Sequence, residues 1–285
     1  MPGTLVLVPT PIGNLDDITL RALRVLREAD VIAAEDTRRT AKLLTHFGIT
    51  TSTISVHDHN ERHRIPGLLK RIAAGQTVAV VTDAGTPTVS DPGFALVRAA
   101  LDAGLRVEAL PGASALTVAV AGSGLPSEVV TFIGFPPSRA GARDRWLAGF
   151  GSIPGTLVLF EAPQRLRATL QAVHNQLGNR PAVVAHELTK VHESWHRGTV
   201  DVLAVDPTLP EKGEFTVVLG PLLPGADAHA MENAAGPEQL GVEFGQMTDS
   251  GGMTRREVIA ELAKRHRLSK KQVYAMVEAG KSSGK

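Results

Sequence analysis

The segment 83–93, with the sequence DAGTPTVSDPG, has a composition that suits ligand binding. It contains two carboxylates, two prolines and several small residues, and it follows an apolar run, 77–81, that predicts a buried strand. A helical pattern comes next, and open α/β sheets usually bind ligands at such strand-to-helix crossings. The segment also fits an ordinary connecting loop, in which Asp91 caps the helix and Pro92 takes its first position.

Two further loops share this small, turn-rich character and also follow predicted strands. They are residues 9–13, with the sequence PTPIG, and residues 111–114, with the sequence PGAS. Loops at the carboxyl ends of strands in one sheet lie together, and such a set can form a shallow pocket that recognises a nucleoside mainly through main-chain groups. S-adenosylmethionine is a nucleoside ligand of this kind, and it carries no phosphate.

Several catalytic and phosphate-binding motifs are absent from the sequence. There is no P-loop, no Gly-x-Gly-x-x-Gly after a strand and no Gly-x-Ser-x-Gly at a strand-to-helix turn. The chain has no cysteine, which excludes disulfides, thiolate zinc sites and a cysteine nucleophile. His59 and His63 form an i, i+4 pair without the rest of a zincin signature, so we interpret them as part of a polar helix start and predict no metal.

The elements that must position these loops alternate between strands and helices through residue 122. Strands are expected at 5–8, 31–34, 54–56, 77–81 and 107–110. This alternation predicts a mostly parallel sheet covered on both faces. Further strands, with fewer helices and some antiparallel pairing, are expected at 129–133, 156–160, 182–185 and 215–219. The predicted fold class is α/β, with domains at 1–122 and 123–222.

Capping residues predict where several helices begin. Asp16 and Asp17 are expected to begin the first helix, and Asn60 is expected to cap the third. Thr254 and Ser269 each open a capping box, which predicts two short helices near the C-terminus.

The C-terminal part of the chain differs from the rest in charge. Residues 253–285 contain nine Lys or Arg and three Glu, a net charge of +6, whereas the remainder carries −5. We therefore expect a basic helical tail at 253–285 that binds an anionic partner, nucleic acid first, or that serves as a solubilising appendage. The expected seam between its two helices consists of Val258, Ile259, Leu262, Val273, Met276 and Val277. Residues 223–252 are rich in Gly, Ala, Glu and Asp, and this composition predicts a linker that is poorly ordered or partly helical.

The compartment is predicted from what the sequence lacks. No apolar run approaches the ~20 residues needed to span a bilayer. The N-terminus has neither the basic segment nor the apolar core of a secretory signal. With the absence of cysteine, these features predict a cytoplasmic protein.

Five sequence blocks occur in order along the chain. They are VPTPIGNL at 8–15, AEDTR at 34–38, DAGTP and DPG within 83–93, LPG at 110–112 and ELTK at 187–190. Together they resemble the tetrapyrrole-methylase-type family of S-adenosylmethionine-dependent methyltransferases, over residues 4–222. Within it they resemble the branch that methylates the ribose 2′-oxygen of a cytidine in the decoding region of small-subunit (16S) ribosomal RNA. The basic tail also matches the appended helices of that branch.

Two departures from the tetrapyrrole-modifying members bear on the substrate. Their first loop usually has a Gly-x-Gly-Pro-Gly-Asp character, where this chain has PTPIGN at 9–14. Their Gly-Asp-Pro appears here as Gly85-Thr86-Pro87. Both differences fit the RNA-modifying branch and disfavour a corrin or porphyrin substrate.

The resemblance implies a class III methyltransferase fold, in which two αβα domains hold S-adenosylmethionine in the cleft between them. It also implies a homodimer. The residues that it assigns to the cofactor come from five loops and are Pro9, Asp83, Gly85, Thr86, Val89, Ser90, Ser114, Ala115, Glu161, Ala162, Gly213 and Glu214.

The implied reaction is an in-line displacement, in which the ribose oxygen attacks the sulfonium methyl group. Positioning of the two partners supplies much of the rate. A base must still take the hydroxyl proton, and the candidates are Asp36, His57, Asp58 and Glu187. Each of them could instead serve as a helix cap or as a salt-bridge partner.

The candidate RNA-binding residues are basic and fall into two groups. Arg38 and Arg39 could bind RNA phosphates, or they could pair with the acidic side chains of Glu35 and Asp36. The second group would add affinity that weakens as salt rises. It lies in the tail and comprises Arg255, Arg256, Lys264, Arg265, Arg267, Lys270 and Lys271.

Two other functions remain open from the sequence. One is a non-catalytic RNA-binding or ribosome-assembly protein, which would bind RNA without the cofactor. The other is a methyltransferase of the same fold that acts on a small molecule or on a protein, which would bind the cofactor whether or not RNA is present.

Deletion of residues 253–285 is expected to weaken RNA methylation and to leave cofactor affinity nearly unchanged, because the charge asymmetry separates the two tasks. Methyl transfer to RNA at two salt concentrations and S-adenosylhomocysteine titration would measure the two effects. Equal losses in both would show that the tail is structural.

Overall fold

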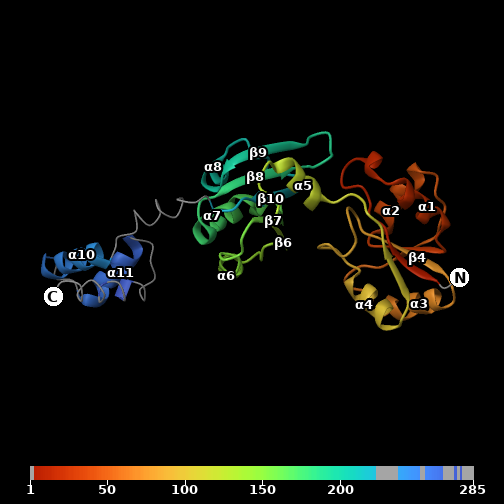
Figure 1. The fold of residues 1–285 in the computed structure, drawn as a ribbon, viewed down its shortest axis with the longest axis horizontal. Coiled ribbons are helices and arrows are strands. Elements are labelled where there is room, and N and C mark those ends of the chain that lie inside the picture. The colour runs from red at the N-terminus through yellow and green to blue at the C-terminus, as the bar shows by residue number, and fades with distance from the viewer. Residues whose placement is uncertain (1–2, 223–236, 251–253, 266–272, 275–276, 278–285) are drawn as a thin grey trace. The chain divides into compact units, whose positions relative to one another are not determined.

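The structure, a computed structural model, describes residues 3–222, 237–250, 254–265, 273–274 and 277 (Figure 1). The chain divides into two compact units, Met1–Pro221 and Leu222–Lys285, and each is described by itself. Within the described ranges, no helix has the length and apolar character needed to cross a membrane.

The first unit begins with a five-stranded sheet in the order β3-β2-β4-β1-β5. Its strands are β1 (Thr4–Leu7), β2 (Val31–Ala34), β3 (Thr53–Ser55), β4 (Thr77–Val81) and β5 (Arg106–Ala109). All the pairings are parallel, so the prediction from alternating strands and helices is confirmed.

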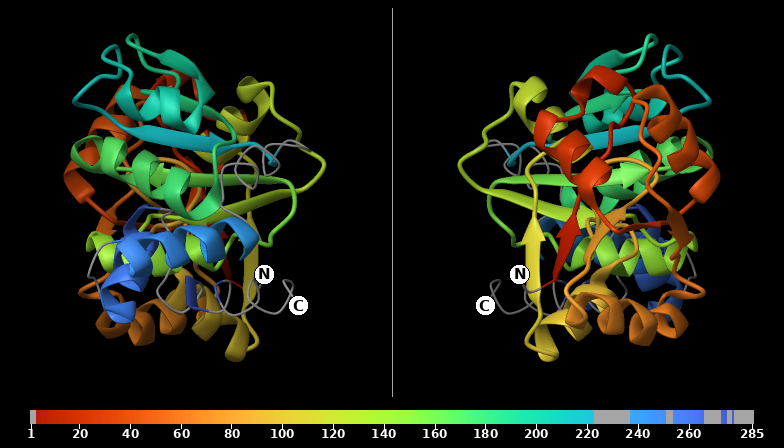
Figure 2. Two further views of the ribbon diagram at one scale, coloured as in Figure 1. Left: turned by 90° about the vertical axis from the view of Figure 1, so that its left-hand side faces the viewer. Right: turned by 90° about the vertical axis from the view of Figure 1, so that its right-hand side faces the viewer.

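Helices cover both faces of this sheet, α1 and α2 on one face and α3 and α4 on the other (Figures 1 and 2). They are α1 (Leu20–Glu28), α2 (Thr37–His46), α3 (Glu61–Ala73) and α4 (Phe94–Asp102). Because side chains alternate along a strand, Val6 enters the core under α1 and α2, whereas Leu5 enters the core under α3 and α4.

Successive strands are added first toward one edge of this sheet and then toward the other. From β1, the connections through α1 and α2 lead outward to β3, and the connections through α3 and α4 return to β4 and then to β5. The carboxyl ends of β1 and β4 are therefore neighbours at the topological switch point, where open α/β sheets bind ligands.

A second five-stranded sheet follows in the order β6-β7-β10-β8-β9. β6 and β7 run parallel and the other pairings are antiparallel, which confirms the predicted mixture. Its strands are β6 (Val130–Gly134), β7 (Thr156–Glu161), β8 (Pro181–His186), β9 (Ser194–Thr199) and β10 (Phe215–Leu219).

Helices also cover both faces of the second sheet. Three of them share one core: α6 (Ala140–Ala148), α7 (Leu166–Leu177) and α8 (Val200–Val205). The opposite face is covered by α5 (Ala115–Ser123), which follows the first sheet in sequence but packs against β10 and β8. The chain therefore crosses from one sheet to the other before α5, at the loop 110–114.

The sequence did not predict β9 or α8. β9 has the sequence SWHRGT and lies at the edge of its sheet, half-exposed, so it lacks the apolar run of a buried strand. α8 has only six residues, which is too short for a helical period to stand out.

Helix starts differ from the predictions at three places. The first α-helix is capped by Thr19, while Asp16 and Asp17 lie in a short 3₁₀ turn before it. Asn60 precedes α3, but its side chain bonds back to Ser55 and His57 instead of capping. α4 begins after Gly93, whose φ of 119° places it in the left-handed region, so Asp91 is not the cap that the sequence predicts.

The second unit contains α10 (Pro237–Ser250) and α11 (Arg255–Arg265). The capping box at Thr254 is confirmed, since Thr254 N–H donates to Glu257 at 2.8 Å. The core of the second unit joins Leu240 and Phe244 of α10 to α11 and to Val273 and Val277. The helix α10, which lies within the predicted linker 223–252, is therefore part of the same packed unit as α11. The capping box at Ser269 and the seam residue Met276 lie outside the described residues.

Gly155 limits how β6 and β7 can join. Its φ is +85°, and a Cβ there would lie 2.4 Å from the backbone oxygen of Val129. We expect Gly155→Ala to lower the free energy of unfolding by about 2–4 kcal/mol, because the strain of a left-handed alanine adds to a backbone shift. Denaturant unfolding would measure the loss.

Gly104→Ala is the matched control, because Gly104 has a similar φ of +69° with open space around its Cβ position. It should lose only the strain, about 1–2 kcal/mol. Equal losses in the two variants would contradict the importance of the contact with Val129.

Candidate functional site

Three loops at the carboxyl edge of the first sheet are bonded into one structure. They are the first loop (residues 8–14), the second loop (residues 82–93) and the third loop (residues 110–114). Thr10 and Gly85 exchange two backbone hydrogen bonds, each of 2.9 Å. The Thr86 hydroxyl donates to the backbone oxygen of Ala113 at 3.1 Å. The second loop is thus hydrogen-bonded to the first loop through Gly85 and to the third loop through Thr86.

The first loop also contacts the second sheet. A Cβ on Gly13 would lie 2.4 Å from Cγ of Lys190 and 2.8 Å from the backbone oxygen of Leu188. Only glycine allows this approach to the segment 187–190. The two sheets of the first unit therefore meet directly beside the three loops.

Backbone strain is concentrated in these same segments. Among the described residues, the non-glycine residues with positive φ are Thr88, Ser90, Glu187 and Thr189. The first two lie in the second loop and the other two lie in the segment that faces Gly13. Strained residues of this kind persist where the surrounding structure holds them, and they cluster at ligand sites.

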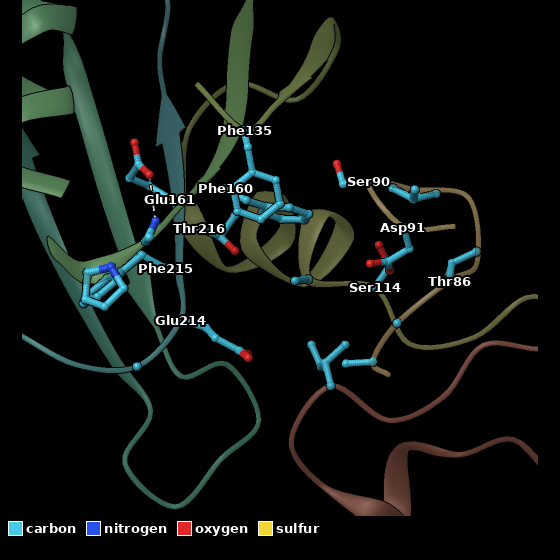
Figure 3. Close-up of a pocket in the computed structure, with 18 residues that line it drawn as sticks. Thr86, Ser90, Asp91, Ser114, Phe135, Phe160, Glu161, Glu214, Phe215 and Thr216 are labelled. Atoms are coloured by element: carbon cyan, nitrogen blue, oxygen red, sulfur yellow. Dashed lines mark hydrogen bonds between the residues drawn. The ribbon is translucent and has the colours of Figure 1, made fainter. Parts of the chain in front are cut away.

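A cavity of about 360 Å³ lies between the two sheets of the first unit (Figure 3). One wall comes from the second loop with Ser114 and Ala115, and it presents small side chains and main-chain groups. The other wall is aromatic: Phe160 lies 5.5 Å, between ring centroids, from Phe135. A cavity with one apolar aromatic wall and one polar main-chain wall suits a nucleoside-sized ligand.

Most of the residues predicted to bind the cofactor line this one cavity. They are Gly85, Thr86, Val89, Ser90, Ser114, Ala115, Glu161, Ala162, Gly213 and Glu214. The remaining two do not line it. Pro9 packs under Gly112. Asp83 binds the Arg39 guanidinium at 3.2 Å.

The prediction missed several lining residues, which are Ile12, Ala84, Asp91, Phe135, Pro163, Phe160, Phe215 and Thr216. Phe160 lies at the carboxyl end of a predicted strand, and this position could have indicated it. Phe215 lies at the start of β10, opposite Glu161 of β7. Because that pairing is antiparallel, the sequence pattern gave no signal for Phe215.

The carboxylate of Glu161 is fully engaged within the protein. Its side chain is buried, it pairs with Arg165 at 2.6 Å, and it accepts a 2.5 Å hydrogen bond from the Thr169 hydroxyl. It also accepts a bond from the N–H of Ala162 (Figure 3). These bonds hold the turn between β7 and α7, so Glu161 fixes the part of the cavity lining that this turn provides.

Two of the predicted bases are paired with cations. Asp36 caps α2, and hydrogen bonds from the side chain and backbone of Arg38 hold the pKa of its carboxyl well below the usual range. Glu187 is partly desolvated, which opposes ionisation, but the bonds from Lys190 and from the N–H of Glu214 lower its pKa. Both carboxylates are weak bases in this arrangement.

The other two predicted bases lie after β3. His57 donates its backbone N–H to Asn60, whose side-chain amide lies 3.0 Å from His57 Nε2. Asp58 faces Glu35 and Asp91, and its charge raises the pKa of each. The structure thus brings Asp58 into a group of carboxylates and keeps His57 in a local turn.

That group comprises Glu35, Asp58, Asp83 and Asp91, which follow β2, β3 and β4. The N–H of Asp83 donates to Glu35 at 3.1 Å. Burial raises the pKa of Glu35, and the hydrogen bond from the Asp83 N–H opposes this rise. Burial, and then the charge of Glu35, raise the pKa of Asp91 to about 7. Asp91 is therefore a titratable group on the wall of the cavity.

Within the described ranges, no three His, Asp or Glu side chains, these four carboxylates included, are arranged so that they could hold a metal ion. Glu35 and Asp83 instead accept hydrogen bonds from backbone N–H groups, and Asp83 also pairs with Arg39.

The structure shows what the candidate RNA-binding arginines contact. Arg38 pairs with Asp36 and Arg39 with Asp83, so both bind acidic neighbours, yet their side chains stay 88% and 66% exposed. The guanidinium carbon of Arg255 lies 5.7 Å from the ring centroid of Phe244 and 5.6 Å from that of Tyr274.

The other tail residues are only partly described. Arg256 is exposed at the start of α11, and Lys264 and Arg265 lie in its last turn. Arg267, Lys270 and Lys271 lie outside the described residues.

Comparison with known proteins agrees with this architecture. The family model of the tetrapyrrole (corrin/porphyrin) methylases matches residues 4–204. The chain is 42% identical over 276 residues to ribosomal RNA small subunit methyltransferase I of Synechocystis sp., covering 96% of this chain and 97% of that protein. It is 46% identical over 235 residues to the protein of the same name from Micromonospora olivasterospora, covering 82% and 74%. The chain therefore belongs to the tetrapyrrole methylase family, and within it to the group that carries this name.

Solved structures share the fold of the first unit. Uroporphyrin-III C-methyltransferase from Thermus thermophilus has a TM-score of 0.54 at 22% identity, over 76% of this chain and 94% of that chain. Diphthine synthase has a TM-score of 0.62 at 18% identity, over 79% and 93%. The predicted family and fold class are confirmed.

Proposed function

We propose that the protein transfers the methyl group of S-adenosylmethionine to the ribose 2′-oxygen of a cytidine in small-subunit ribosomal RNA. The observation that carries the proposal is the similarity to the Synechocystis protein named ribosomal RNA small subunit methyltransferase I, which extends over 96% of this chain. The cavity supports it, because ten of the residues assigned to the cofactor by resemblance line it together.

The cavity residues fit this cofactor chemically. Main-chain groups of the second loop, with the hydroxyls of Ser90 and Ser114, can bond the polar groups of a nucleoside. Phe135 and Phe160 can stack on its base and keep water away. When bound, the cofactor supplies a methyl group already activated by a sulfonium. Alignment of that group with the acceptor oxygen is then the main task of the protein.

The proposal includes the RNA contacts and the setting. Arg38 and Arg39 lie at the rim of the same sheet edge with exposed side chains and would contact phosphates, together with the basic residues of the tail. The substrate would be the naked RNA or the assembled small subunit. We further propose a homodimer in the cytoplasm, where ribosomes are assembled.

Phe160→Ala is expected to weaken S-adenosylhomocysteine binding about tenfold, or ~1.4 kcal/mol, because it removes an aromatic wall of the cavity. Titration calorimetry would measure the dissociation constant. Phe94→Ala is the control, since Phe94 is 72% exposed on α4 and does not line the cavity. An equal change in both variants would contradict the assignment of the cavity to the cofactor.

The RNA substrate is tested with small subunits from a strain that lacks this protein. After incubation with methyl-labelled S-adenosylmethionine, we expect the label in RNA, at one cytidine that becomes resistant to alkaline cleavage because its 2′-oxygen is methylated. Label in a protein or in a small molecule would support the same-fold alternative. Binding of RNA with no cofactor binding and no label would support a non-catalytic assembly protein.

A further inference from the structure

Three carboxylates line the cavity, and two of them are engaged elsewhere. Glu161 is bound by Arg165 and Thr169. Glu214 is 72% exposed and pairs with Lys190. Asp91 is half-buried on the wall opposite Phe135 and Phe160, and within the described part of the chain no cation pairs with it (Figure 3). Asp91 is thus the carboxylate of this cavity that can take up a proton.

The second loop holds Asp91 at this position. The N–H of Thr88 donates to the backbone oxygen of Pro92 at 3.3 Å, and the N–H of Val89 donates to that of Thr86 at 3.3 Å. Ser90, next to Asp91, has a φ of 63°. The N-cap position of α4 is taken by Gly93, which has no side chain to cap the helix. The Asp91 side chain therefore does not cap α4, and it lines the cavity instead.

The groups that face Asp91 favour its protonated form. The charged ones are Glu35 after β2, Asp58 after β3 and Asp83 after β4, all acidic, and Arg39 is already paired to Asp83. The Thr82 side chain acts in the opposite direction and lowers the pKa of Asp91, but it does not cancel the effect of burial and of Glu35. Together with burial, these charges raise its pKa from the ordinary value to about 7. A base with a pKa near the working pH is much more effective than an ordinary aspartate.

We infer that the Asp91 carboxylate accepts the proton of the ribose 2′-hydroxyl during methyl transfer. This inference rests on the proposed function and adds a catalytic residue that neither the motifs nor the resemblance assigned. In the step, the oxygen–carbon bond forms and the carbon–sulfur bond breaks, with its electron pair going to sulfur. The hydroxyl proton moves to Asp91, so a sulfonium and a carboxylate become a neutral thioether and a neutral acid. Water then takes the proton from Asp91.

The first test is Asp91→Asn, with Asp102→Asn as control, because Asp102 is exposed on α4 and pairs only with Arg98 in the described structure. We expect kcat to fall about 100-fold or more in the Asp91 variant and to stay unchanged in the control. Affinity for S-adenosylhomocysteine, whose sulfur is uncharged, and the KM for RNA should stay within about threefold of the wild type. A loss of affinity as large as the loss of rate would overturn the inference and make Asp91 a cofactor ligand.

The second test uses pH. For the wild type, kcat/KM should rise as pH passes about 7, because Asp91 must be ionised to act, and this rise should be absent in Asp91→Asn. Glu35→Gln removes a neighbouring charge, so it should move the rise to lower pH while Asp91 remains. An unchanged profile in either variant would overturn the inference.

Folding of the variants is checked by thermal melting. The folded-state pKa of Asp91 is raised, so its charged form costs stability as pH rises through about 7, and the Asn variant lacks this cost. Asp91→Asn should therefore melt no lower than the wild type at pH 8. Wild-type transfer to RNA that persists in Asp91→Asn would refute this inference alone, whereas a wild type that does not methylate RNA would refute the proposed function.

Discussion

The site depends on the adjacency of β1 and β4. Because these parallel strands pair directly and end at the same edge, their following loops must satisfy their main-chain polar groups against each other, and they do so between Thr10 and Gly85. The third loop joins through Thr86. These hydrogen bonds hold the three loops in place, so the loops can present small side chains and main-chain groups to a ligand and need no long, flexible side chains.

The second sheet provides what the first sheet lacks. Its first two strands end in Gly134 and Glu161, and the phenylalanines beside these ends form an aromatic wall. The antiparallel β10 begins at the same edge, so Gly213, Glu214 and Phe215 lie there as well. Mixed strand directions thus bring residues from opposite ends of strands to one cavity.

Charge at the edge of the first sheet opposes stability. Burial disfavours the ionised forms of Glu35 and Asp91, and the charges of Asp58 and Asp83 add to this effect at Asp91. Arg38 and Arg39 relieve only Asp36 and Asp83. Carboxylates with perturbed pKa values are found where a protein handles protons or cations, and of these four only Asp91 lines the cavity.

The sequence by itself determined the family, the parallel first sheet and most of the cavity-lining residues, because local patterns and ordered motifs encode strands, turns and small-residue loops. It also left Asp36 and Glu187 open as bases, and the structure shows both paired with cations. Tertiary structure alone decided that Asp91 lines the cavity and does not cap α4, because α4 begins after the left-handed Gly93. It also decided the raised pKa of Asp91, which comes from burial and from carboxylates that follow three separate strands. Burial and charge–charge distances arise only when distant segments pack, and no local pattern contains them.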